Sequence, residues 1–301
     1  METNIPRFLE EKLESQYGKE LAKTIIEGYK KTRKVTLRVN TIKSNSDKIE
    51  EELKKQQIEY EKVGWSEEAF IIKNKREKEI EELEIYKNGE IYLQSLSSML
   101  PPIVLEPKEG ADILDMAAAP GGKTTQIAAL VNNKASITAC ELNNIRAQRL
   151  KYNIEKQGAT CVYVMQTDAR KIDDFFSFDQ ILLDAPCSGS GTLNINDESL
   201  NKVFTEKLIQ KSVKSQKELL KKALKILKPG KEMVYSTCSI LQEENEDIIK
   251  TLDKKEYEII PIKFDGMEQL PVLPTIIEGT LCVMPNDLYE GFFIAKIRKK
   301  R

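Results

Sequence analysis

Hydrophobic and polar positions follow two recurring patterns along most of the chain. From about residue 110 onward, short apolar runs typical of buried strands are followed by stretches with apolar residues at helical spacing. The apolar runs predict six strands, at residues 111–117, 136–141, 161–168, 178–185, 232–239 and 291–297. Helical patterns separate the first five, and the longest lies near residues 199–227. This alternation is typical of a mostly parallel, doubly wound α/β sheet with helices on both faces.

The first hundred residues have a different order of elements. Residues 1 to about 30 show apolar positions at helical spacing, and residues 34–42 alternate like a strand. A helical pattern begins at Ser46, and two more short strands are predicted, at residues 69–74 and 90–94. The segment from Leu100 to Gly110 contains two consecutive prolines and is predicted to be a turn. We therefore expect a small N-terminal α/β module at residues 1–105 and a larger domain at residues 106–301.

The amino-acid composition excludes several kinds of catalytic site for such a fold. The chain has 301 residues, nearly balanced charge and no histidine. Ser-His and Cys-His dyads are therefore excluded, and acid–base work falls to carboxylates, Lys, Tyr, Cys or water. The five cysteines show no close pairing, which argues against a disulfide scaffold and a structural metal site. Without an apolar run of membrane-spanning length or a signal-peptide pattern, a cytoplasmic protein is expected. Two basic runs, Lys30 to Arg38 and Lys296 to Arg301, are candidate nucleic-acid contacts, although charge runs usually form a solvated surface.

Polar residues stand at the carboxyl ends of the predicted strands. In open parallel sheets, ligands bind at this edge. The residues at these positions are Asp115, Glu141, Asp168, Asp184, Cys187 and Cys238. A single acid there is typically a helix cap, whereas acids at three consecutive strand ends indicate a binding site.

The turn after the first strand of the larger domain consists of small residues. These are Ala117, Ala118, Ala119, Pro120, Gly121 and Gly122, followed by Lys123. A P-loop would need glycine at position 117, and the Gly-x-Gly-x-x-Gly motif of dinucleotide-binding folds is absent. Small residues still let a ligand approach the backbone amides. Glu141 is placed to bind both hydroxyls of a ribose, and Asp168 to accept from an adenine amino group. Ribose and adenine without phosphate indicate S-adenosylmethionine.

Cys187 and Cys238 differ from the other three cysteines. Cys140, Cys161 and Cys282 lie in apolar runs and are expected in the core. A thiolate beside a methyl donor suits a pyrimidine substrate, because its addition to carbon 6 makes carbon 5 enamine-like and able to attack the methyl group. The carbon-5 proton then leaves, and the thiol is expelled. Asp184 is placed to act as an acid at ring nitrogen 3. This chemistry does not choose between the two thiols.

Three ordered motifs carry a resemblance to a known family. DMAAAPGGKT (residues 115–124), DAPCSGSGT (184–192) and STCSI with EENE (236–246) resemble the RNA 5-methylcytosine methyltransferases of the Sun/NSUN type, which are RsmB-like. The similarity covers about residues 90–297. It implies a Rossmann-like class I S-adenosylmethionine-dependent methyltransferase fold, preceded by an RNA-binding module.

The resemblance also implies roles for single residues. Cys238 would be the nucleophile, and Cys187 would help release the product by aiding proton removal and elimination. Lys123 would steady the catalytic Asp184. The methyl donor would be bound by Ala117, Ala118, Ala119, Pro120, Gly121, Gly122, Lys123, Glu141, Asp168 and Asp184, and Arg146 matches a family position near the cofactor and RNA.

We therefore expect a monomeric enzyme that methylates carbon 5 of cytosine in RNA, either rRNA or tRNA, through a covalent cysteine adduct. One alternative is a DNA cytosine-5 methyltransferase, in which Cys187 would be the nucleophile. Another is a non-catalytic RNA-binding assembly factor, in which Cys238 would be dispensable. Relatives often carry a histidine shortly before the last strand, and this chain has none.

Overall fold

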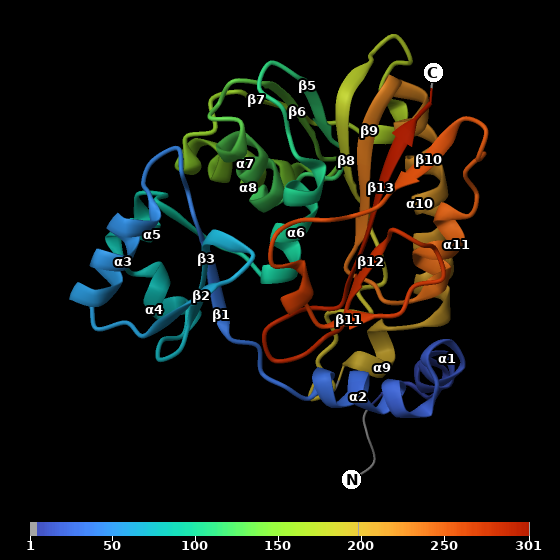
Figure 1. The fold of residues 1–301 in the computed structure, drawn as a ribbon, viewed down its shortest axis with the longest axis horizontal. Coiled ribbons are helices and arrows are strands. Elements are labelled where there is room, and N and C mark those ends of the chain that lie inside the picture. Colours follow the sequence, from blue (N-terminus) through green and yellow to red (C-terminus); the bar gives the residue numbers. More distant parts are fainter. Residues whose placement is uncertain (1–4, 198, 301) are drawn as a thin grey trace.

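A computed structural model describes residues 5–197 and 199–300, which form two sheets (Figure 1). The strands of the larger sheet are β5 (Asp112–Asp115), β6 (Ser136–Cys140), β7 (Val162–Met165), β8 (Phe178–Asp184), β9 (Leu227–Thr237), β10 (Tyr257–Ile260), β11 (Val272–Leu273), β12 (Leu281–Val283) and β13 (Phe292–Lys299). Their order is β11-β12-β13-β9-β8-β5-β6-β7, with β10 also paired to β13. Strands β5 to β9 are parallel, and β13 is antiparallel to β9. All six strands predicted for this part are confirmed.

Helices cover both faces of this sheet. They are α6 (Leu96–Leu105), α7 (Gly122–Leu130), α8 (Asn144–Gln157), α9 (Leu200–Val203), α10 (Glu206–Ile226) and α11 (Glu246–Ile249). Side chains along β8 alternate between the two faces, because Ile181 and Leu183 join one buried cluster and Leu182 joins the other. The helical pattern predicted near residues 199–227 is divided into α9 and α10, because Thr205 caps α10 by accepting from the Leu208 amide.

Helix α6 corrects the prediction of a turn at residues 100–110. Pro101 and Pro102 lie inside this helix, which is buried on nearly every side. Because proline has no amide hydrogen, Pro102 cannot donate to the Ser98 carbonyl one turn earlier. The side chain of Gln94 donates to that carbonyl instead, at 3.1 Å. A tertiary contact therefore compensates for the proline.

The smaller sheet belongs to the N-terminal module. Its strands are β1 (Val35–Val39), β2 (Tyr60–Val63), β3 (Ser66–Ile72) and β4 (Ile91–Leu93), and its helices are α3 (Ser46–Lys55), α4 (Glu77–Glu81) and α5 (Glu84–Lys87). The sheet is antiparallel with the order β2-β3-β1-β4, and it has its own buried cluster. Asn45 starts α3 by accepting from the Lys48 amide. The predicted strands and helix are confirmed, whereas β2, α4 and α5 were not predicted.

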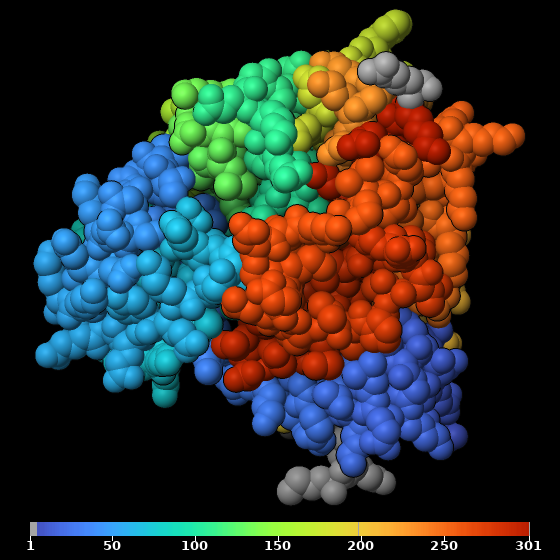
Figure 2. All heavy atoms as spheres, viewed as in Figure 1, coloured from blue at the N-terminus to red at the C-terminus, as the bar shows by residue number. Residues whose placement is uncertain are grey.

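Helices α1 (Arg7–Tyr17) and α2 (Lys19–Tyr29) are separated at Gly18, whose φ is +78°. They pack against the larger domain and not against the smaller sheet, which forms a separate lobe (Figures 1 and 2). Leu9, Leu13 and Ile25 share one buried cluster with residues of α10 and β9. Residues 5–29 thus pack against the larger domain, and the expected division at residue 105 stays a prediction.

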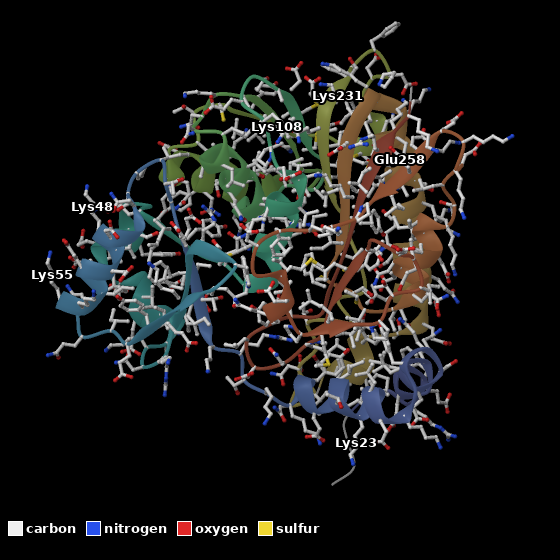
Figure 3. The ribbon with its side chains drawn as sticks, in the orientation of Figure 1. Lys23, Lys48, Lys55, Lys108, Lys231 and Glu258 are labelled. Carbon is white, nitrogen blue, oxygen red and sulfur yellow. The ribbon has the colours of Figure 1, made fainter. Side chains whose placement is uncertain are left out.

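Charged side chains cover the outside of the molecule. Lys23 on α2, and Lys48 and Lys55 on α3, are exposed and point outward (Figure 3). Among residues 5–197 and 199–300, we find no helix with the length and apolar character needed to cross a membrane.

Candidate active site

The carboxyl ends of the parallel strands carry two adjoining pockets. The larger, of about 510 Å³, is lined by residues that include Glu141, Arg146 and Asp168. The smaller, of about 390 Å³, is lined by residues that include Lys123 and Cys238. Ala117 contributes to both. The structure thus brings the predicted site residues to one edge of the sheet but divides them between two cavities.

The small-residue turn links β5 to α7. Gly121 precedes α7 with a φ of +111°, a conformation that side chains rarely adopt. The Ala119–Pro120 peptide bond is cis. Helix α8 holds this turn, because Arg146 Nη2 donates to the Ala119 carbonyl at 2.8 Å and Asn153 Nδ2 donates to the Pro120 carbonyl at 2.8 Å. The backbone that would face a ligand is therefore fixed from behind.

Two carboxylates follow β6 and β7 at the larger pocket. Glu141 is 6% exposed, and its Oε1 accepts from the Asn143 amide at 2.7 Å. Asp168 accepts from the Arg170 amide and binds the Arg170 guanidinium with both oxygens, at 2.9 and 2.7 Å. These hydrogen bonds lower the pKa of Asp168. Asp168 therefore does cap the following turn, as the alternative interpretation held, and it also lines the pocket.

Lys123 and Asp184 form an ion pair in the wall of the smaller pocket. Their Nζ and Oδ2 atoms are 2.8 Å apart, and the side chains are only 14% and 25% exposed. Burial alone would lower the pKa of Lys123, but the charge and hydrogen bond of Asp184 outweigh it, so this pKa is raised. Ser236 Oγ donates to the other Asp184 oxygen at 2.7 Å, and Lys123 also donates to Ser98 Oγ at 2.8 Å. Three elements thus fix this carboxylate.

Asp115, at the end of β5, lies beside this pair. Burial raises its pKa to about 6, although the Thr124 hydroxyl opposes the shift by donating to Oδ2 at 2.7 Å. Its carboxyl group also lines the smaller pocket.

Cys187, which follows β8, and Cys238, which follows β9, are in contact. The Sγ atoms of Cys187 and Cys238 are 3.1 Å apart, and both residues are partly buried. The hydrogen bond with Cys238, burial and the charge of Glu244 raise the pKa of Cys187 well above its usual value. Cys238 lines the smaller pocket. Cys140 and Cys282 are buried in the core, as predicted, and Cys161 is partly buried.

Sequence reasoning missed several residues that shape the site. They are Ser98, Ser236, Glu244 and Phe292. Ser236 lies in the STCSI motif and Glu244 in the EENE motif. Their place in these motifs could have marked them as candidate site residues. The ring of Phe292 lies 5.3 Å from Lys123 Nζ and forms part of the smaller pocket, but its position in an apolar strand gave no hint of this contact.

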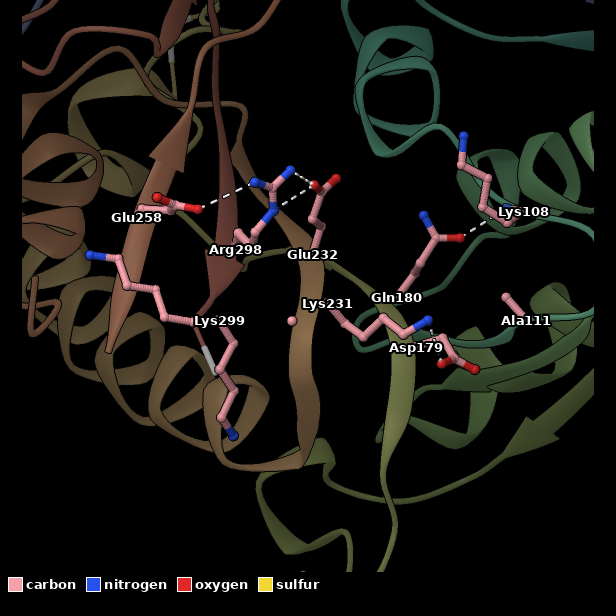
Figure 4. A pocket seen from close by; sticks show the side chains of 11 residues that line it. Lys108, Ala111, Asp179, Gln180, Lys231, Glu232, Glu258, Arg298 and Lys299 are labelled. Carbon is pink, nitrogen blue, oxygen red and sulfur yellow. Dashed lines mark hydrogen bonds and ion pairs between the residues drawn. The ribbon is translucent and has the colours of Figure 1, made fainter. Parts of the chain in front are cut away.

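The C-terminal basic run does not form an open basic patch. It lies mostly in β13, beside a cavity of about 620 Å³ at the amino ends of the parallel strands (Figure 4). Arg298 pairs with Glu232 and Glu258, at 2.5 and 3.3 Å, and Lys231 pairs with Asp179 at 3.2 Å. The run ends at Arg301, which lies outside the described residues. In the other basic run, Arg38 is 4% exposed and donates to Gln94 Oε1.

The doubly wound sheet, the small-residue turn and the acids at successive strand ends define a Rossmann-like class I methyltransferase fold. A family model described as 16S rRNA methyltransferase RsmB/F matches residues 102–298. A second, described as the ferredoxin-like domain of RsmF/B-like methyltransferases, matches residues 5–78. The chain belongs to the RsmB/F methyltransferase family.

Relatives and solved structures agree with this assignment. The chain is 36% identical over 278 residues to ribosomal RNA small subunit methyltransferase F of Shewanella sp. (strain ANA-3), covering 88% of this chain and 56% of the relative. It is 32% identical to "Probable ribosomal RNA small subunit methyltransferase B" of Bacillus subtilis (strain 168), covering 99% and 67%. The chain thus spans little more than half the length of the Shewanella relative.

Two structures from Pyrococcus horikoshii match nearly the whole chain. NSun6, crystallised with SFG, has a TM-score of 0.87 and 28% identity, with 98% of each chain covered. A methyltransferase homolog protein has a TM-score of 0.85 and 34% identity, with 98% of this chain and 95% of the other covered. The N-terminal module and the larger domain are therefore arranged as in solved proteins.

Proposed function

We propose that this chain transfers the methyl group of S-adenosylmethionine to carbon 5 of cytosine in RNA, through a covalent adduct with Cys238. The observation that carries the proposal is that Cys238 lines the same pocket as the Lys123–Asp184 pair and that its sulfur lies 3.1 Å from that of Cys187. Because the relatives are named ribosomal RNA methyltransferases, rRNA is the first candidate substrate and tRNA the second. We further propose a monomer that works in the cytoplasm without a metal ion.

The larger pocket suits S-adenosylmethionine by its set of charged groups. Its two arginines are already paired, Arg146 with Glu141 and Arg170 with Asp168, so they are poorly placed to bind a phosphate. The Glu141 oxygen nearest to Arg146 lies 3.5 Å from it and retains the capacity to accept from a ribose hydroxyl. The small side chains of the turn at residues 117–122 would let a ligand approach its backbone amides closely. Bound there, S-adenosylmethionine would supply a methyl group on a sulfonium sulfur.

The smaller pocket suits the target base. Cytosine would have to be single-stranded or flipped out of a helix to reach it. The Cys238 thiolate adds to carbon 6, and the electron pair moves toward carbon 5 and ring nitrogen 3. We propose that a proton is shared between Asp184 and nitrogen 3, with the Lys123 ammonium as the neighbouring donor.

Carbon 5 then bonds to the methyl carbon as the methyl–sulfonium bond breaks. The carbon-5 proton passes to the Cys187 sulfur as the Cys187 thiol proton passes to Cys238 Sγ, the electron pair returns to the ring, and the bond between carbon 6 and Cys238 Sγ breaks. Cys187, whose sulfur is next to Cys238, is placed to aid proton removal and elimination. The net change to the base is a methyl group on carbon 5 in place of its hydrogen.

Two observations support Cys238 over Cys187 as the nucleophile. Cys238 lines the pocket that would hold the base, and Cys187 is not among its lining residues. The hydrogen bond with Cys238, burial and the charge of Glu244 raise the pKa of Cys187, which supports the thiol form at this residue. A thiol is a poor nucleophile but can still donate or relay a proton.

The decisive experiment combines substrate pools with cysteine variants. The protein is incubated with labelled S-adenosylmethionine and separate rRNA, tRNA and DNA pools, and the label is assigned to a base by nuclease digestion. We expect label in 5-methylcytosine of RNA, and label in DNA alone would contradict the proposal. On a denaturing gel, Cys187→Ser should accumulate a protein–RNA adduct and Cys238→Ser should not. The reverse pattern would make Cys187 the nucleophile, and a Cys238→Ala protein with full function would indicate the assembly factor.

A further inference from the structure

The two cysteines lie on loops that are hydrogen-bonded to each other. One loop, residues 186–192, follows β8, and the other, residues 238–244, follows β9. The Gly191 amide donates to the Cys238 carbonyl at 3.0 Å, and the Ile240 amide donates to Ser190 Oγ at 3.0 Å. The position of each sulfur therefore depends on both loops.

One buried carboxylate binds both loops at once. Glu244 is 0% exposed. Its Oε1 accepts from the Ser188 amide at 2.7 Å, and its Oε2 accepts from Ser188 Oγ at 2.5 Å and from Ser239 Oγ at 2.6 Å. Each of these serines directly follows one of the cysteines, Cys187 or Cys238. Glu244 thus joins the two residues that set the direction of the two thiols.

The surroundings of Glu244 hold its own side chain in place. Gln216 Nε2 donates to Oε1 at 3.3 Å and to the Pro186 carbonyl at 3.0 Å. The Tyr235 hydroxyl donates to the Glu244 carbonyl at 2.7 Å. All the donors to the carboxylate are neutral groups, although burying a carboxylate without a cation is costly. An apolar side chain of similar size would fill the same space without this cost. We therefore infer that the buried charge of Glu244 has a function.

We propose that Glu244 is a positioning residue, which holds the two thiols at their working separation and places a negative charge on the Cys187 side of the pair. The inference rests on the methyl transfer proposed above. The opposite charge lies on the other side, because Lys123 and Cys238 both line the smaller pocket, which Cys187 does not line. After the hydrogen bond with Cys238 and burial, the charge of Glu244 contributes to the raised pKa of Cys187. A carboxylate beside one thiol and an ammonium beside the other would assign proton transfer to Cys187 and nucleophilic attack to Cys238.

The test compares Glu244→Gln with Glu243→Gln. Both positions lie in the same short turn, but Glu243 is 43% exposed and pairs with Lys12 at the surface. In Glu244→Gln we expect kcat to fall about 100-fold, as for other displacements of reacting groups. The affinity for S-adenosylmethionine should stay unchanged, because the larger pocket is intact. Glu243→Gln should leave both unchanged.

A second readout does not depend on turnover. Alkylation of each cysteine by iodoacetamide at pH 8 is followed by mass spectrometry, in wild type and in both variants. Without the charge of Glu244, Cys187 should be alkylated about tenfold faster, since a thiolate reacts and a thiol does not. Faster alkylation without methylation of any nucleic acid would support the charge effect and contradict the proposed function. Methylation by wild type with unchanged kcat and unchanged Cys187 alkylation in Glu244→Gln would overturn the inference alone.

Smaller changes keep the test valid if Glu244→Gln does not fold. Ser188→Ala and Ser239→Ala each remove one hydroxyl donor from the carboxylate. Each should lower kcat without changing the affinity for S-adenosylmethionine. Wild-type kcat in both variants would overturn the inference.

Discussion

The hydrogen bond between Thr124 and Asp115 predicts a pH-dependent loss of stability in Thr124→Val. Thr124 is fully buried, and its hydroxyl donates to Asp115 Oδ2 at 2.7 Å. Valine has nearly the same shape but cannot donate. The substitution therefore removes a hydrogen bond from a carboxyl group whose pKa burial has already raised from 3.8 to about 6.

The sign follows from the raised pKa of Asp115. Its folded form holds a proton more tightly than the unfolded chain, so this contribution to stability is complete below about pH 4 and is lost as the pH rises through 6. A hydrogen bond to an ionised group contributes about 1.5–3 kcal/mol, against about 0.5–1.5 kcal/mol for a neutral pair. At about 1.4 kcal/mol per pKa unit, losing the difference raises the pKa of Asp115 by about one further unit. Thr124→Val should therefore cost about 1–2 kcal/mol more at pH 8 than at pH 5.

Urea unfolding of wild type and variant at pH 5 and pH 8 measures this difference. Thr125→Val is the matched control, because the Thr125 hydroxyl donates to backbone carbonyls of Gly121 and Gly122 and to no carboxyl group. Its cost should be the same at both pH values. An equal cost of Thr124→Val at both pH values, or a larger cost at pH 5, would refute the reasoning about Asp115.

Three further predictions concern the reacting groups and the loop that carries Cys187. In Asp184→Asn, the methylation rate at saturating labelled S-adenosylmethionine should fall about 10²–10⁴-fold, because an acid at the ring is lost; a wild-type rate would contradict this role. Hydrogen peroxide should convert Cys187 and Cys238, whose sulfurs are 3.1 Å apart, into a disulfide with release of water, seen as the loss of two hydrogen atoms in the intact mass and reversed by dithiothreitol; Cys187→Ser should show no such loss. In Gly191→Ala, the new Cβ would lie 2.0 Å from the Gly291 carbonyl oxygen, so the loop must shift, at a cost of about 1–3 kcal/mol; an unchanged melting temperature and kcat would show that the loop tolerates the methyl group.

The sheet could be predicted from sequence because its strands are buried on both faces. Parallel strands such as β8 read as continuous apolar runs, and their carboxyl ends converge on one edge whatever lies between them. The same rule placed Glu141, Asp168 and Asp184 in one region. The roles expected from their positions, in binding ribose, adenine and the target base, stay predictions, and the Lys123–Asp184 pair was expected only from the resemblance to a known family.

The features that could not be predicted depend on contacts between distant segments. Two prolines ordinarily end a helix, but α6 continues because Gln94 supplies the missing donor. In the sequence, Glu244 is one of several neighbouring acids, and only the structure shows that it is buried against serines of two loops. The sequence pattern groups α1 and α2 with the rest of residues 1–105, whereas these helices pack against the larger domain. An amphipathic pattern shows that a helix has an apolar face and not which surface covers it.

The packing of α1 and α2 bears on where a functional fragment of the proposed enzyme can begin. The Tyr29 hydroxyl donates to the Ser190 carbonyl, and the Tyr17 hydroxyl donates to the Ile240 carbonyl, both at 2.6 Å. These carbonyls belong to the two cysteine loops, so the first two helices support the loops from behind. A truncated protein that starts at residue 102, where the match to the methyltransferase family model begins, would retain every proposed reacting group and lose this support. The methyltransferase family model thus leaves out two helices that hold the cysteine loops, and the second family model, over residues 5–78, includes them.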